Sequence, residues 1–403
     1  MKICLVSREY PPETGKGGVG TYMYLITRAL EQLGHSVFVV SLSKTAEYEY
    51  EDGRTHVSRI SPKLPRGFWR LGKWIPLWLL QYSANVRSKL WELHQRFRFD
   101  VIEFAECGGE GFFFSRKPFC PFVVKIHGPL FLNHEFDVHY QSPVRRCVED
   151  WMERFVAVRG NAITTASKTM RDLIEKRWRI PRERMTVIPH PVDLDMFVPK
   201  HVHDDNGKTR GEINILYVGR LERRKGVHAL ADAAPVILQK YPEARFTFIG
   251  GDTKTGNGGC SIQGELEDRL RESRSIQATS FLGRRDRSDL VPFYQRCNVF
   301  VMPSLYEPVG FTGLEAMACG KAVIASRNSG LAEWITDGVS GLVVEPGCSR
   351  DLAEKIIRFV ELPQPAREQI GVAARRVAEQ FSLESVGRRL VELYESVTSN
   401  GKG

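Results

Sequence analysis

The sequence predicts an α/β protein built from two doubly wound domains, and three observations support this. The chain has 403 residues, more than one hydrophobic core usually organises. Short apolar runs alternate with stretches of helical spacing, the rhythm of a parallel sheet covered by helices on both faces. A polar stretch without periodicity, 199–211, interrupts this rhythm and reads as a linker, and the alternation restarts beyond it.

The first domain is expected over 1–198. It opens with an apolar strand at 2–7, a loop rich in glycine and proline, a helical segment at 21–33 that stops at Gly34, and a second strand at 36–41. This β-α-β opening implies parallel strands. Further strands are expected at 100–104, 122–126, 162–165 and 185–188.

The second domain is expected over 212–380, and residues 381–403 form a final helix that returns to the first domain. The strands are expected at 213–218, 245–249, 279–282, 299–302, 322–325 and 342–344. The helices between them are expected at 227–240, 265–274, 289–297, 312–318 and 331–336, and 350–397 reads as wholly helical. Ligands of such sheets bind at the carboxyl ends of the strands, and here also in the cleft between domains.

Composition narrows the class of protein. Hydrophobic residues make up 42% and charged residues 26%, which is ordinary for a globular chain. The most apolar segment, 74–80, is much shorter than the roughly 18 residues of a membrane span. The eight cysteines have no zinc-ribbon spacing and read as free thiols. A cytoplasmic protein, soluble or peripheral to the membrane, is therefore expected.

The net charge of +9 is concentrated in the first half, since residues 1–195 carry 29 Lys and Arg against 22 Asp and Glu. This suggests an anionic partner. Residues 63–98 hold eight basic residues, one acidic residue and four of the seven tryptophans, which predicts peripheral contact with an anionic membrane. The alternative is that these tryptophans pack in the core. No nucleic-acid motif occurs in its proper context, so nucleic acid is not expected as a partner.

The segment 15–20 matches the letters GxGxxG, but it is a weak dinucleotide signature. Seven residues separate it from the first strand, and no acidic residue ends the second strand. The favoured interpretation is a loop that leads into a helix N-terminus, where the amides around Gly17 and Gly18 meet an anion. A plain turn is the alternative.

Two motifs that resemble metal sites are interpreted otherwise. Asp193-Leu194-Asp195 lies next to prolines, so a turn is favoured over a metal-binding DxD. His134 and His139 are five residues apart, which would place them on different faces of a helix. No metal and no cofactor are expected.

A second group of motifs predicts a diphosphate site. Arg220 and Lys225 follow a strand and precede a helix, and two cations near helix amides suit a diphosphate. Glu307 and Glu315 follow another strand, and carboxylates accept hydrogen bonds from vicinal hydroxyls. A diphosphate flanked by hydroxyl-rich groups is a nucleotide-sugar.

These motifs, with Asn328–Glu333, resemble in order and spacing the GT-B fold retaining glycosyltransferases of family GT4, the glycosyl transferases group 1. The fold implied is two Rossmann-like domains that face each other across a cleft. The family usually has Pro-Asn-Gly-Val-Asp where this chain has Pro-His-Pro-Val-Asp at 189–193, which bears on the hinge.

The resemblance implies a role for each site residue. Arg220 and Lys225 would bind the diphosphate, Glu315 the ribose, and Glu307 the donor sugar. Five further donor-binding residues would be Gly17 and Gly18, which close over the diphosphate, and Gly310, Phe311 and Thr312, where the amides of Phe311 and Thr312 contact the sugar or phosphate. His127 would lie beside the reacting centre, with a buried structural histidine as the alternative.

The function implied is transfer of a sugar from a nucleoside-diphosphate sugar to an acceptor hydroxyl, with retained configuration and no metal. The acceptor is expected to be a lipid-linked or envelope glycan. A small soluble acceptor is one alternative, and a nucleotide-sugar epimerase of the same fold is another. The motifs do not identify the sugar, the base or the acceptor.

Overall fold

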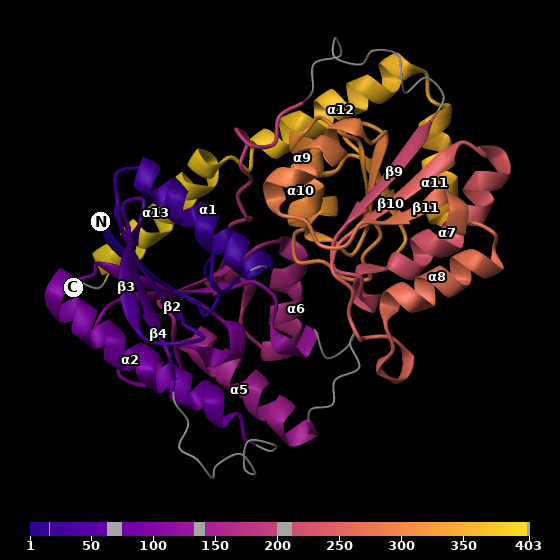
Figure 1. Ribbon diagram of the computed structural model, residues 1–403. Coiled ribbons are helices and arrows are strands. Elements are labelled where there is room, and N and C mark those ends of the chain that lie inside the picture. The colour runs from indigo at the N-terminus through magenta and orange to yellow at the C-terminus, as the bar shows by residue number, and fades with distance from the viewer. Residues whose placement is uncertain (16, 63–74, 133–141, 200–211, 401–403) are drawn as a thin grey trace. The chain divides into compact units, whose positions relative to one another are not determined.

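The computed structural model describes residues 1–15, 17–62, 75–132, 142–199 and 212–400 (Figure 1). The described residues form two compact units. The first unit contains the chain up to Pro191 together with the part from Leu383 onward, and the second contains Val192–Ser382. Each unit is a parallel sheet with helices on both faces, which confirms the expectation of two doubly wound α/β folds.

In the described part of the first unit the sheet has eight strands, in the order β3-β4-β2-β1-β5-β6-β7-β8. All neighbours are parallel except β3 and β4, which form an antiparallel pair at one edge. The central strands are buried on both faces because helices cover both sides. The strands are β1 (Lys2–Val6), β2 (Ser36–Leu42), β3 (Tyr48–Asp52), β4 (Thr55–Ile60), β5 (Val101–Ala105), β6 (Phe122–Ile126), β7 (Ala162–Thr165) and β8 (Met185–Val187).

Helices α1 (Gly18–Gln32) and α13 (Leu383–Asn400) pack together on this unit. Gly387 of α13 lies against Ala29 and Leu33 of α1, and a Cβ there would come within 2.9 Å of Leu33 Cδ1. A second group of helices packs together, and α6 borders β7 and β8 (Figure 1). These helices are α2 (Leu77–Phe97), α3 (Phe112–Arg116), α5 (Pro143–Arg159) and α6 (Lys168–Trp178).

The second unit has six strands, all parallel, in the order β11-β10-β9-β12-β13-β14. They are β9 (Ile213–Val218), β10 (Ala244–Ile249), β11 (Thr279–Phe281), β12 (Val299–Met302), β13 (Val323–Ser326) and β14 (Leu342–Val344). Contacts group α7 with α8 and α11, and α10 with α9 and α12. The helices are α7 (Val227–Lys240), α8 (Ile262–Glu272), α9 (Arg287–Arg296), α10 (Phe311–Ala318), α11 (Ser349–Glu361) and α12 (Gln364–Glu379).

Two sequence expectations need correction. The segment 350–397, expected to be wholly helical, is interrupted twice, because the chain is extended at Leu362 before Pro363 and turns again before α13. Residues 330–334 form a 3₁₀ turn instead of an α-helix. Among the described residues, no helix is both long enough and apolar enough to cross a membrane.

Candidate active site

Each sheet reverses its strand order at one point, and the site residues gather there. In the second unit β9 lies between β10 and β12, so the chain leaves β9 and β12 in neighbouring positions at the same edge. Crevices outside the carboxyl ends of the strands at such a reversal are where doubly wound sheets bind ligands. The loops that follow β9 and β12 are 219–226 and 303–310, which carry the basic and acidic motifs.

A glycine brings these two loops into contact. Gly226 has φ of +65°, and a Cβ at this position would lie 1.9 Å from the carbonyl oxygen of Pro303. Close by, the amide of Leu305 donates to the carbonyl oxygen of Arg224 at 2.8 Å. The backbones of the two loops are therefore joined, and their charged side chains meet.

Lys225 and Glu307 form an ion pair at this junction, with the ammonium donating to Oε2 of the carboxylate. Burial lowers the pKa of Lys225, and the facing Glu307 only partly offsets this. Burial also opposes ionisation of Glu307, but Lys225 and Arg224 outweigh it and hold the pKa of the carboxyl below its usual range. Both groups therefore carry charge at neutral pH.

Arg224 and Glu222 form a second ion pair beside the first. The Arg224 guanidinium is buried, donating to Glu222 Oε1 at 2.6 Å and to the carbonyl oxygen of Tyr306 at 3.1 Å, and its Nη1 lies 3.9 Å from Glu307 Oε2. Arg220 lies 3.2 Å from the other oxygen of Glu222, but its side chain is 64% exposed. The loop thus presents one exposed cation, Arg220, beside one partly buried ion pair.

Helix α10 begins at Phe311, four residues after Glu307. Gly310 has φ of +97°, and a Cβ there would come within 2.5 Å of Met302 Sδ, so only glycine fits this turn. Phe311 and Thr312 form the first turn of α10, and no side chain caps this end of the helix. The amides of a helix N-terminus favour an anion.

Glu315, one turn further along α10, is only 2% exposed. Its Oε1 accepts from Arg287 Nε at 2.9 Å, and its Oε2 accepts from the hydroxyl of Tyr294 at 2.8 Å. Burial raises the pKa of Glu315, and Arg287 partly opposes this. The carboxylate expected to bind ribose is therefore held by two protein groups, both from α9.

In the first unit the glycine-rich loop follows β1, which lies between β2 and β5 at the reversal of that sheet. Gly17 is the extended residue before α1, no side chain caps the helix, and both Gly17 and Gly18 are exposed. Gly15 has φ of +82°. The expected arrangement, a loop that ends in an uncapped helix N-terminus, is present.

His127 follows β6 and is buried in a group of polar side chains. Its amide and that of Gly128 both donate to Glu106, at 2.9 and 2.6 Å. Its Nδ1 lies 3.3 Å from His190 Nε2, and Tyr22 packs edge-on against its ring. The buried Nε2 has no hydrogen-bond partner among the described residues.

Lys125, two residues before His127, is fully buried and donates to the carbonyl oxygen of Ile188. Burial lowers the pKa of Lys125 to about 8, opposed by Glu103 and Glu106. Burial, reinforced by this ammonium, holds the pKa values of His127 and His190 well below the usual range of an imidazole. Both rings are therefore neutral at pH 7.

The metal-like motifs have other roles or lie outside the described residues. Asp193 accepts from the amides of Asp195 and Met196 at 3.1 and 2.9 Å, which confirms the predicted turn. His134 and His139 lie outside the described residues, as does 63–74 of the basic segment. Within the described ranges, no group of three or more His, Cys, Asp or Glu side chains could hold a metal ion.

Sequence reasoning missed several residues that hold the site together. Arg224 and Glu222 belong to a charged run that reads as solvated, and Glu106 is an isolated acid after a strand. Arg59, which holds the glycine-rich loop, lies in a strand that the sequence analysis did not identify. The segment His56–Ile60 contains only two apolar residues, Val57 and Ile60, so its pattern carried little signal of a buried strand.

Comparison with known proteins gives the family. Residues 16–196 match the model for Glycosyltransferase Family 4, and residues 200–377 match that for Glycosyl transferases group 1. The chain is 27% identical to a glycogen synthase of Mycobacterium tuberculosis, over 98% of this chain and 94% of that one. It is 30% identical to the D-inositol 3-phosphate glycosyltransferase of Corynebacterium urealyticum, over 56% and 54% of the two chains.

Solved structures share the fold. The sucrose-phosphate synthase of Thermosynechococcus elongatus superposes with a TM-score of 0.78 at 22% identity, covering 99% of both chains. The Anabaena protein HepE, solved with UDP and glucose, superposes with a TM-score of 0.74 at 21% identity, covering 98% of this chain and 100% of that one. The fold is therefore GT-B, and the two family models together span most of the chain. This chain belongs to the family 4 glycosyltransferases and is a transferase enzyme.

Proposed function

We propose that this enzyme transfers a sugar from a nucleoside-diphosphate sugar to an acceptor hydroxyl with retention of the anomeric configuration. The observation that carries the proposal is the junction of the loops after β9 and β12. An exposed cation, Arg220, lies in the same loop as Lys225 of the Lys225–Glu307 ion pair, and Glu307 is four residues before the uncapped N-terminus of α10. Cations and helix amides together suit a diphosphate, and a carboxylate suits sugar hydroxyls.

In the proposed reaction, the acceptor hydroxyl oxygen forms a bond to the anomeric carbon as the bond from that carbon to the diphosphate oxygen breaks. The acceptor proton passes to the leaving diphosphate oxygen on the same face of the sugar. Arg220 and Lys225 stabilise the negative charge that grows on the leaving group, which is the largest contribution such a site makes. Exclusion of water protects the donor from hydrolysis.

Relatives support a nucleotide-sugar donor. The Anabaena protein HepE was solved with UDP-glucose, and a trehalose-6-phosphate synthase of similar fold was solved with UDP-2-fluoro-glucose. The donor test is a thermal-shift screen of UDP-, GDP- and ADP-sugars, because a ligand that binds the native state raises its melting temperature. Failure of all of them to stabilise the protein contradicts the proposal.

Incubation of the preferred donor, with analysis of its products, separates transfer from epimerisation. The preferred donor, incubated without acceptor, should be hydrolysed only slowly and should not change into a second nucleotide-sugar. Conversion to an epimer would replace the proposal by the alternative of the same fold. Adding acceptor hydroxyl compounds should release the nucleoside diphosphate, and the anomeric configuration of the product, read by NMR, should equal that of the donor.

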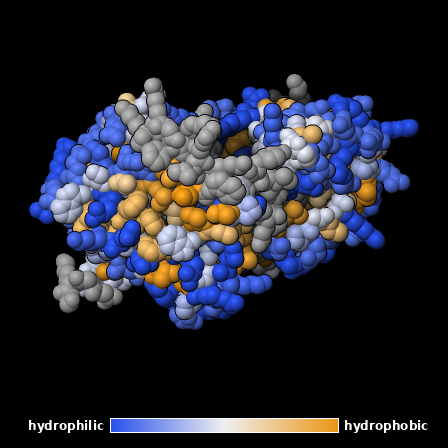
Figure 2. All heavy atoms as spheres, turned by 90° about the horizontal axis from the view of Figure 1, so that it is seen from below, coloured by the Kyte–Doolittle hydropathy of each residue, from blue (hydrophilic) through white to orange (hydrophobic). Residues whose placement is uncertain are grey.

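We also propose that the acceptor is lipid-linked or part of an envelope glycan, and that α2 and α5 of the first unit dock on an anionic membrane. Large apolar side chains are exposed there, with Trp91 52%, Val144 51% and Trp151 49% accessible. The face seen in Figure 2 carries a group of apolar residues on this unit. Arg146 and Arg154 lie on the same helix as Trp151. Tryptophan favours the interface and basic residues favour anionic headgroups.

Part of the basic charge is already neutralised, which limits the strength of docking. Lys89 pairs with Glu92 at 2.8 Å and lies 3.6 Å from Glu49, which is also 3.5 Å from Arg96. Each such surface pair reduces the charge available to headgroups. Docking is therefore expected to depend on the apolar side chains as well as on charge, and to weaken rather than vanish in high salt.

Flotation with anionic vesicles tests the membrane contact. Val144→Ser on α5 should reduce flotation, whereas Val372→Ser on α12 should not, although Val372 is equally exposed at 54%. A chain that stays at the bottom of the gradient with anionic vesicles at low salt favours a soluble acceptor. Equal loss in the two variants would show that α5 has no special role.

A further inference from the structure

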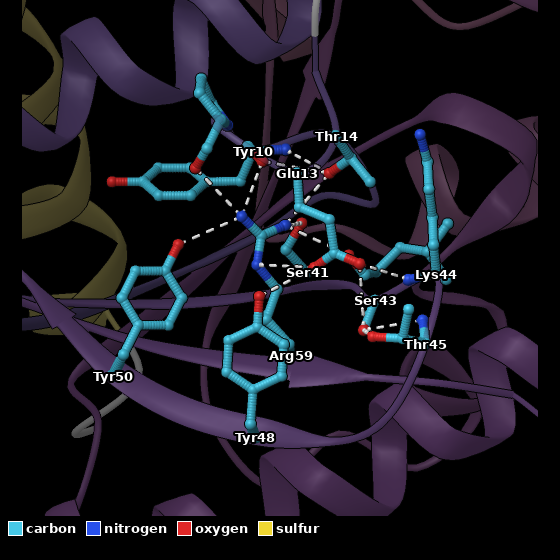
Figure 3. Close-up of polar contacts among 12 residues, drawn as sticks. Tyr10, Glu13, Thr14, Ser41, Ser43, Lys44, Thr45, Tyr48, Tyr50 and Arg59 are labelled. Carbon is cyan, nitrogen blue, oxygen red and sulfur yellow. Dashed lines mark hydrogen bonds and ion pairs between the residues drawn. The ribbon is translucent and has the colours of Figure 1, made fainter.

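Arg59, at the end of β4, is a buried arginine that the proposed reaction does not use. It is only 1% exposed. The nearest carboxylate, Glu13 Oε2, lies 3.9 Å from its Nε, beyond hydrogen-bond distance. Burying a guanidinium is costly unless its donors are satisfied, so its neutral partners matter. They divide into two sets (Figure 3).

The first set belongs to the loop after β1. Arg59 Nη2 donates to the carbonyl oxygens of Tyr10 and Pro11 at 2.8 and 3.0 Å, and Nη1 donates to Thr14 Oγ1 at 3.1 Å. Thr14 Oγ1 also accepts from the amide of Tyr10 at 3.0 Å. Residues 10–14 are thereby folded around one guanidinium, as Figure 3 shows.

The second set belongs to the strands. Nη1 also donates to Ser41 Oγ at 3.2 Å and to the carbonyl oxygen of Leu42 at 3.1 Å, and Nη2 donates to the hydroxyl of Tyr50 at 3.1 Å. Arg59 therefore joins the loop to the edge of the sheet formed by β2, β3 and β4. Its guanidinium has as many contacts on the loop side as on the strand side.

The glycine-rich segment continues directly from the held part of the loop. A Cβ at Gly15 would lie 2.9 Å from the amide nitrogen of Tyr10, and one at Gly20 would lie 2.1 Å from the carbonyl oxygen of Gly15. Gly15 thus packs against Tyr10, which Arg59 holds, and Gly20 in the first turn of α1 packs against Gly15. A displacement of 10–14 would be transmitted to Gly17 and Gly18.

We propose that Arg59 is a positioning residue for the donor: by fixing residues 10–14 it sets where the amides of Gly17 and Gly18 stand. The inference rests on the proposed function, in which those amides meet the donor diphosphate. A competing explanation is that Arg59 only stabilises the fold. The two explanations predict different behaviour when single contacts on its two sides are removed.

Thr14→Val and Ser41→Ala form a matched pair for this test. Each replaces a buried side chain that accepts one hydrogen bond from Arg59 Nη1, but Thr14 is in the loop, where its hydroxyl also bonds the backbone of Tyr10, and Ser41 is in β2. Thr14→Val should weaken binding of UDP-glucose by at least about two- to tenfold, since that is the usual effect of losing a single hydrogen bond. Ser41→Ala should leave binding within twofold of the original chain, whatever it costs in stability.

Hydrogen exchange of the peptide 10–21 supplies a measurement that requires no nucleotide-sugar. Exchange should accelerate in Thr14→Val and in Arg59→Lys, and remain unchanged in Ser41→Ala. Equal effects of Thr14→Val and Ser41→Ala on exchange would overturn the inference, as would equal effects on UDP-glucose binding. If UDP-, GDP- and ADP-sugars all fail to bind the original chain, the proposed function fails, and hydrogen exchange alone decides whether Arg59 positions the loop.

Discussion

Lys225 and Glu307 are 82 residues apart in the chain, yet their side chains form one partly buried ion pair at the carboxyl edge of the second sheet. The pair exists because Gly226 lets the loop after β9 pack against Pro303. Both charges lie in a site of low accessibility, where electrostatic interactions are stronger than in water. A donor diphosphate would therefore meet a cation whose position is already fixed by its carboxylate partner.

Lys225→Ala should slow turnover much more than it affects folding. Loss of a cation that stabilises leaving-group charge costs on the order of 2–4 kcal/mol, about thirtyfold to a thousandfold in kcat. Lys240→Ala, which breaks an exposed pair with Glu361, is the control and should keep normal turnover. Steady-state kinetics with the preferred donor decides, and near-normal turnover of the Lys225 variant would remove Lys225 from the site.

Glu315→Gln should weaken binding of the nucleoside diphosphate and also lower the stability of the second unit. The loss of stability follows from the structure, because a neutral amide cannot balance Arg287 as the carboxylate does. Tyr294→Phe removes only the hydroxyl that donates to Oε2, and separates the two effects. If Glu315 contacts the ribose, titration calorimetry should give Glu315→Gln a larger loss of UDP affinity than Tyr294→Phe. Equal losses would indicate that Glu315 acts only through its α9 partners.

The sequence was sufficient for the regular parts of the fold because those parts depend on local pattern. Strands such as β6 and β9 are largely apolar runs, each with one polar residue, Lys125 and Asn214, and their ends agree with the expected ones. The antiparallel pair of β3 and β4 was not predicted from the sequence. Strand β3 alternates exposed acids with tyrosines at a sheet edge and has no buried face. The motif residues Arg220, Lys225, Glu307 and Glu315 could be named from spacing and resemblance.

The spacing of residues along the sequence could not predict which side chains contact the site residues. The contact of Glu315 with Arg287 depends on how α9 packs on α10, and that of Arg59 with Thr14 depends on the path of a loop 45 residues earlier. Such contacts follow from tertiary packing and have no periodic signature. The sequence could therefore suggest which groups belong to the candidate site, but not which side chains hold them in place.

Activity should survive excess chelator. In the proposed reaction Arg220 and Lys225 supply the positive charge at the diphosphate, and Asp193 Oδ1 accepts from two backbone amides. Turnover in EDTA should stay within about twofold of the untreated enzyme. Complete loss that manganese or magnesium restores would assign a metal to the site. Differential scanning calorimetry of the same samples would show whether unfolding causes any loss of turnover.

His190→Asn should lower kcat without changing donor affinity. His190 Nε2 lies 3.3 Å from His127 Nδ1, so it fixes the orientation of the neutral His127 ring. Loss of one hydrogen bond of this kind corresponds to about two- to tenfold. His94→Asn is the control. His94 lies in α2, and its Nδ1 accepts from the amide of Phe99, just after the end of that helix. A raised donor KM with unchanged kcat would contradict the positioning role.

Glu110 should make the first unit less stable as the pH rises from 5 to 8. This carboxyl is buried, and burial raises its pKa to about 8, although Arg8 opposes the shift. Between an unfolded value near 4.5 and that folded value, the native state holds a proton that the unfolded chain has lost. The contribution to the free energy of unfolding is complete below pH 4.5 and disappears as the pH approaches 8, by at most about 1.4 kcal/mol for each pH unit. Glu106 and Glu153, whose pKa values burial also raises, act in the same direction.

Urea unfolding at several pH values therefore tests Glu110→Gln by its slope, not by its absolute stability. The variant should lose less stability between pH 5 and 8 than the original chain does. Glu13→Gln is the control: burial opposes ionisation of Glu13, but the Lys44 amide and the Tyr48 hydroxyl hold its pKa below the usual range. Its contribution changes only at more acidic pH, so its slope between pH 5 and 8 should equal that of the original chain. An unchanged slope in Glu110→Gln would mean that the carboxylate stays ionised beside Arg8 throughout this range.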